Sequence, residues 1–90
     1  MVILRNPSDY KTMSTVELRS EKRILEMIIY IEDFFYIDNL KKTVAEGGTE
    51  IINVLPRGYL SRVLMASRIV KGANSRVDII ELELARRADP

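Results

Sequence analysis

The 90-residue chain has the length of one domain, and its 47% apolar content and net charge of +1 are ordinary for a globular protein. Without cysteine it can form no disulfide framework and no thiolate metal site, and without histidine it lacks the commonest catalytic base. These absences favour a non-catalytic domain that binds no metal, no cofactor and no small-molecule substrate.

The N-terminal residues lack the basic and then long apolar arrangement of a signal peptide. The most apolar segment, residues 24–37, is interrupted by acidic residues, so we expect no membrane contact and a cytoplasmic protein. The absence of cysteine and glutamine beside 30% charged residues is typical of heat-adapted proteins. We read residues 1–13 as a leader, residues 14–87 as a single domain and residues 88–90 as a tail.

The leader offers a short edge strand at Val2-Ile3-Leu4, followed by a turn at residues 6–9. Residues 15–19 alternate polar and apolar side chains, which predicts a half-buried strand. Ser20 is then a candidate N-cap for the helix that follows.

Residues 24–45 fit two kinds of secondary structure. Six large apolar residues recur there at helical spacing and predict the apolar face of a helix, with Glu26 and Asp33 pointing outward. The six are Ile24, Met27, Ile28, Ile31, Phe34 and Phe35. A strand stays possible because residues 27–31 are rich in β-branched and aromatic side chains, and Asp38 could divide the stretch into two helices.

The Gly47-Gly48 pair is expected to end this segment, as glycine commonly does after a helix. Residues 50–55 are apolar on both faces, which predicts a central, covered strand. Pro56-Arg57-Gly58 then has the composition of a tight turn.

Residues 59–71 predict an amphipathic helix that Gly72 closes. Residues 77–85 alternate apolar and acidic side chains, which predicts a final strand. The resulting order is β-α-β-α-β. We therefore expect an α+β fold, a two-layer α/β sandwich with two helices packed on one face of a small mixed sheet.

Three segments, taken in order, carry a family resemblance. Residues 16–27 contain Glu21-Lys22-Arg23 between strand-like and helix-like runs, residues 49–71 contain Pro56-Arg57-Gly58, and residues 75–84 are strand-like. Together they resemble the Alba family of archaeal chromatin and RNA-binding proteins. The resemblance implies an Alba-like fold, a homodimer, and binding of double-stranded DNA or RNA through the backbone with little sequence preference. A DNA-binding member would be associated with the nucleoid.

The candidate nucleic-acid-binding residues follow from this resemblance. In the expected fold two parallel strands bring their following turns to the same edge of the sheet, where cations can contact successive phosphates. The residues expected there are Lys22, Arg23, Arg57, Gly58 and Arg62.

A second function stays open, namely an Alba-like protein–protein interaction module with weak or no nucleic-acid binding. Glu21 stands where the family has a basic residue, and residues 72–75 are too short for the family's basic hairpin arm. Tyr59 also replaces a basic side chain. In addition, the apolar segment Phe34-Phe35-Tyr36-Ile37 exceeds what a small core would bury.

Overall fold

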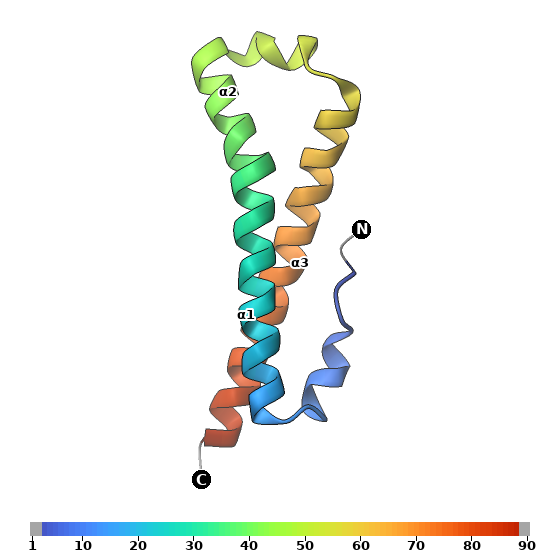
Figure 1. The fold of residues 1–90 in the computed structure, drawn as a ribbon, viewed down its shortest axis with the longest axis vertical. Helices are drawn as coiled ribbons and strands as arrows, with labels where there is room; N and C mark the ends of the chain where they lie inside the picture. Colours follow the sequence, from blue (N-terminus) through green and yellow to red (C-terminus); the bar gives the residue numbers. More distant parts are fainter. Residues whose placement is uncertain (1–2, 89–90) are drawn as a thin grey trace.

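The computed structural model describes residues 3–88, which form a long helical hairpin (Figure 1). The first arm passes through three consecutive helical segments, and one long helix returns beside it. The first arm consists of α1 (Thr15–Glu32), the π-helical segment η2 (Asp33–Asp38) and α2 (Asn39–Gly47). The 3₁₀ segment η3 (Thr49–Val54) leads to the returning helix α3 (Arg57–Ala88), and η1 (Pro7–Lys11) packs against α3.

The predicted α+β sandwich is wrong, because residues 3–88 contain no strand and therefore no sheet. The expected strand at residues 15–19 is the first turn of α1, residues 50–54 lie in η3, and residues 77–85 lie within α3. Of the expected edge strand, Ile3 and Leu4 are not in a strand and Val2 lies outside the described residues. The Alba-like architecture implied by the resemblance is therefore not the observed one.

The start of α1 explains why residues 15–19 are helical. Ser14 is the N-cap: its hydroxyl accepts a hydrogen bond from the Glu17 backbone N–H at 3.1 Å, and the Glu17 carboxylate accepts one from the Ser14 N–H at 3.2 Å. This reciprocal capping box satisfies two backbone donors that a helix start leaves free. The hydrogen bond from Ser14 also lowers the pKa of Glu17. Ser20, the expected cap, lies inside the helix.

Residues 77–85 are helical because their apolar residues also fit a period of 3.6. Val77, Ile80 and Leu84 are three and four residues apart and pack into the core, whereas Leu82 is 72% exposed. A strand would have placed Leu82 on the same face as its even-numbered neighbours. The spacing of the apolar side chains that face α1 is therefore that of a helix and not that of a strand. Gly72 was predicted to end the helix, but it lies inside α3.

The core lies in the half of the hairpin where α1 and α3 run side by side and the leader covers them (Figure 1). Leu18 and Leu25 of α1, seven residues apart, meet Ala73 and Ile80 of α3, also seven apart. This is the heptad spacing of two packed helices. Tyr10 of η1 closes the cluster and is 1% exposed.

The leader is attached to α3 by close packing and by two arginines. A Cβ on Gly72 would lie 3.1 Å from the Leu4 Cδ1, so glycine here makes room for the leader. Arg76 donates to the Arg5 carbonyl at 2.8 Å, and Arg87 donates to the Tyr10 carbonyl at 3.4 Å. Two hydrogen bonds between residues more than seventy positions apart therefore help to hold the N-terminal segment in place.

Toward the connecting segment the two arms diverge, and α2 continues the first arm from η2 and contacts η3 (Figure 1). The predicted helix end at Gly47-Gly48 is confirmed: α2 ends at Gly47, and Gly48 has a φ of 76°, which favours glycine. The hairpin measures 55 × 22 × 14 Å, with a radius of gyration of 16.7 Å. A compact chain of this length has about 12 Å.

Candidate functional site

The structure does not gather the predicted nucleic-acid-binding residues at one edge. Lys22 lies on α1 and forms an ion pair with Glu81 of α3 at 3.3 Å, whereas Arg57 begins α3 at the far end of the hairpin. The helical rise places Arg57 about 36 Å along α3 from Glu81. Since the two expected turns do not follow strands, no common rim forms between Lys22 and Arg57.

The other predicted residues have separate surroundings. Arg23 is exposed on α1 and has no ion-pair partner among residues 3–88. Gly58 lies beside Arg57, and a Cβ there would meet nothing within 4 Å. Arg62 points to α1, where its guanidinium donates to the Glu32 carboxylate at 2.8 Å. The cations therefore fall into two separate pairs, with Lys22 and Arg23 on α1 and with Arg57 and Arg62 near the start of α3.

Arg62, Glu32 and Tyr36 form a cluster where α1 becomes π-helical. The Glu32 side chain is 5% exposed, and the Arg62 guanidinium lies 4.0 Å from the centre of the Tyr36 ring. Hydrogen bonding to Glu32 raises the pKa of Arg62. One carboxylate oxygen of Glu32 and one guanidinium nitrogen of Arg62 have no hydrogen-bond partner among residues 3–88. The pair connects the first arm to α3, and removal of either partner would leave the other charge without compensation.

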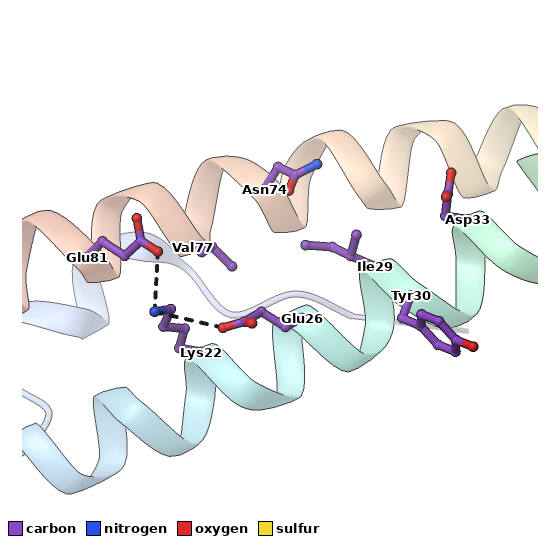
Figure 2. Close-up of a pocket in the computed structure, with 8 residues that line it drawn as sticks. All are labelled: Lys22, Glu26, Ile29, Tyr30, Asp33, Asn74, Val77 and Glu81. Carbon is purple, nitrogen blue, oxygen red and sulfur yellow. Dashed lines mark ion pairs between the residues drawn. The ribbon is translucent and has the colours of Figure 1, made fainter.

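A groove of about 460 Å³ runs between α1 and α3 (Figure 2). Ile29 and Val77 form its apolar part, and Lys22 closes one end by pairing with Glu26 at 3.9 Å and with Glu81. The remaining lining residues are Tyr30, Asp33 and Asn74. Residues 3–88 hold no group of three acidic side chains placed to share a metal ion.

The most unusual surface is an apolar stripe on the first arm, which we call the outer face. It consists of Ile24, Met27, Ile31, Phe34 and Phe35, whose exposures are 49%, 59%, 43%, 48% and 56%. Steps of three and four residues place these side chains along one side of the helix. The stripe spans α1 and η2, so the hairpin presents a continuous row of large apolar groups to solvent.

The outer face is the stripe that the sequence predicted to be the buried face. The residues that are buried on α1 are Leu18, Leu25 and Glu32, a set offset from the predicted one. Glu26 and Asp33 are exposed, as expected, and line the open groove beside α3 (Figure 2). The helical spacing of this segment was therefore predicted correctly, but the choice of its buried apolar face was wrong.

Aromatic contacts hold the two phenylalanine rings of the outer face in defined positions. The Phe34 ring stacks on Tyr30 with centroids 5.9 Å apart and meets Phe35 edge-on at 5.2 Å. Rings that pack on each other are already held in position, so less side-chain freedom is lost when a partner covers them. Of the apolar segment 34–37 singled out in the sequence, Phe34 and Phe35 are exposed and Tyr36 and Ile37 are half-buried.

Exposed apolar residues on α3 do not form a comparable stripe. Leu64 and Met65 lie near its start, and Ile79 and Leu82 lie near its other end. The surface between them carries polar and charged side chains such as Arg68, Lys71 and Asp78. The outer face is therefore the longest apolar row on the described residues.

No family model matches the chain, and comparisons with curated proteins and with solved structures found no match. These comparisons leave the Alba resemblance itself untested, although the fold it implies is not observed. Among residues 3–88, no helix combines the length with the apolar composition that crossing a membrane requires.

Proposed function

We propose that this chain is a non-catalytic protein-interaction module, a helical hairpin that binds a partner chain through the outer face. The observation that carries the proposal is the row of five large apolar side chains, each between 43% and 59% exposed. Monomeric proteins rarely expose a contiguous apolar patch of this kind unless it has a binding role. Phenylalanine and methionine are also among the residues enriched at interfaces.

Charge is kept away from this surface. The acidic residues in the middle of the first arm point elsewhere: Glu26 and Asp33 line the groove, and Glu32 is buried against Arg62. A solvated helix face would carry such charges itself. The distribution fits a face that is covered by another protein surface.

Nucleic-acid binding stays an untested prediction, and no observation in residues 3–88 favours it over protein binding. Lys22 is engaged by two carboxylates and Arg62 by one, which reduces their availability to phosphates. Glu26 and Glu81 also place negative charge beside Lys22, which would repel a polyanion.

The proposal is tested by placing a photo-crosslinking amino acid at Ile31, in the middle of the outer face, in cells that make the full chain. The matched control carries it at Lys71, an exposed position on α3. We expect crosslinked adducts from position 31 and few or none from position 71. Equal yields at the two positions, or none at either, would refute the proposal.

A further inference from the structure

We propose that the partner on the outer face is a second copy of this chain, packed antiparallel about a two-fold axis near Ile31 to give a four-helix bundle. This inference rests on the proposed function, because it names the occupant of the same surface. It adds the stoichiometry, the direction of packing and the charge pair that fixes the register.

The hairpin exposes more surface than a compact monomer of its mass, and the excess is large enough to supply one partner's share of a dimer interface. The chain exposes 6662 Å² for a mass of 10.4 kDa. A compact monomer of this mass exposes about 5,400 Å², so the excess is about 1,300 Å². A standard stable interface takes about 800 Å² from each partner. The excess therefore covers one full interface, and helices with an apolar seam are the elements that pack in such bundles.

The charges at the two ends of the outer face are opposite. Arg23 precedes Ile24 at one end, and Asp38 follows Phe35 at the other; Asp38 is the charged residue of η2 beyond the apolar row. In an antiparallel pair, a two-fold axis near residues 30 and 31 places Arg23 of each copy opposite Asp38 of the other. A two-fold interface repeats this ion pair, since each contact occurs twice.

The apolar residues fit the same register. With Arg23 opposite Asp38, Met27 of one copy lies opposite Phe34 of the other, and Ile31 lies near the axis. A parallel arrangement would instead set Arg23 against Arg23 and Asp38 against Asp38, and like charges opposed across an interface are unfavourable. Asp38 already contacts Lys42 at 3.2 Å, but its carboxylate has a second oxygen to accept a hydrogen bond from arginine. Self-complementarity of this surface therefore favours the antiparallel dimer.

Sedimentation equilibrium of the purified full chain tests the stoichiometry. We expect a mass of twice 10.4 kDa, with dissociation on dilution. Met27→Glu should give a monomer, because it places a charge near the centre of the outer face. The matched control Leu82→Glu, at a residue of α3 that is 72% exposed, should remain dimeric. Circular dichroism checks that both variants keep the helical content of the wild type.

A charge swap tests the register. Arg23→Glu and Asp38→Arg should each raise the dissociation constant about tenfold, since each change creates two repulsive contacts. The double variant with both changes should return to within about threefold of the wild type. Single variants without effect, or a double variant no tighter than the singles, would overturn the antiparallel register.

The outcome separates this inference from the proposed function. A wild-type chain that stays monomeric at all concentrations overturns the second copy as partner. If position 31 then still crosslinks to a different chain, the proposed function stands without this inference. If Leu82→Glu dissociates the dimer as fully as Met27→Glu does, the dimer interface is not on the outer face and this inference fails, while crosslinking at position 31 still decides the proposed function.

Discussion

Replacing Arg62 by alanine is expected to destabilise the hairpin by about 3 kcal/mol. Removing one partner of a buried ion pair leaves a charge without compensation, which typically costs about 3–5 kcal/mol. The Glu32 carboxylate is 5% exposed, but the Arg62 side chain is 32% exposed, so water can enter in its place. We therefore expect the lower end of that range, including the lost contact with the Tyr36 ring at 4.0 Å.

Urea unfolding followed by circular dichroism measures this change. The free energies of wild type and Arg62→Ala are compared at one protein concentration, because association would add to the apparent stability. For a chain of this length the loss corresponds to a Tm lower by about 12–24 °C. Arg68→Ala, at an exposed arginine on the same helix, is the matched control and should stay within about 0.5 kcal/mol of the wild type.

A double variant separates the lost ion pair from the lost packing. In Glu32→Met/Arg62→Met no charge remains buried, so stability should return to within about 1 kcal/mol of the wild type or exceed it. A loss below about 1 kcal/mol for Arg62→Ala, or a double variant as unstable as the single one, would show that the reasoning about burial is mistaken.

Three further predictions concern the leader and the helix ends. Tyr10→Phe should keep or raise the free energy of unfolding by up to about 1 kcal/mol, since its buried hydroxyl has no partner among residues 3–88; a clear loss in urea unfolding would contradict this. Arg86 and Arg87 lower the pKa of Glu83 from 4.5 to about 2. The contribution of the ionised Glu83 carboxylate to the free energy of unfolding is therefore complete above pH 4.5 and is lost as pH falls through about 2. Glu83→Gln should flatten the dependence of stability on pH across that interval in urea unfolding. Ser14→Ala should cost about 1 kcal/mol by removing the capping box, whereas Ser20→Ala, within α1, should not lower stability in the same assay.

The helices at residues 24–45 and 59–71 were predictable from spacing, and so was the helix end at Gly47-Gly48. The expected strands at 15–19 and 77–85 were not strands, because short apolar runs fit both periods. For residues 15–19 a deciding signal was present: Ser14 and Glu17 have the spacing of a capping box. For residues 77–85 the choice between strand and helix depends on packing against α1, and the local sequence carries no signal for that contact.

The sequence did not predict which face of the first arm is exposed. Residues 24–35 carry two apolar faces, and spacing alone does not tell which of them packs inside the molecule. The face of α1 that packs inside the molecule includes Glu32. The charge of Glu32 is compensated there by Arg62, which lies thirty positions further along the chain. A charged residue at a heptad position next to Leu18 and Leu25 looks like an exposed site until its partner is known. The outer face therefore emerges only from the tertiary structure.

The attachment of the leader by Arg76 and Arg87 has a consequence for biosynthesis. Tyr10 is made before α3, but the carbonyl of this residue and that of Arg5 receive their hydrogen bonds from α3. While the ribosome still holds residues 73–87 in its exit tunnel, Leu18 and Leu25 have no partner helix to cover them. The nascent chain must therefore emerge with its future core and its outer face both open to solvent, and a neighbouring nascent copy or a chaperone can reach either one before the hairpin closes.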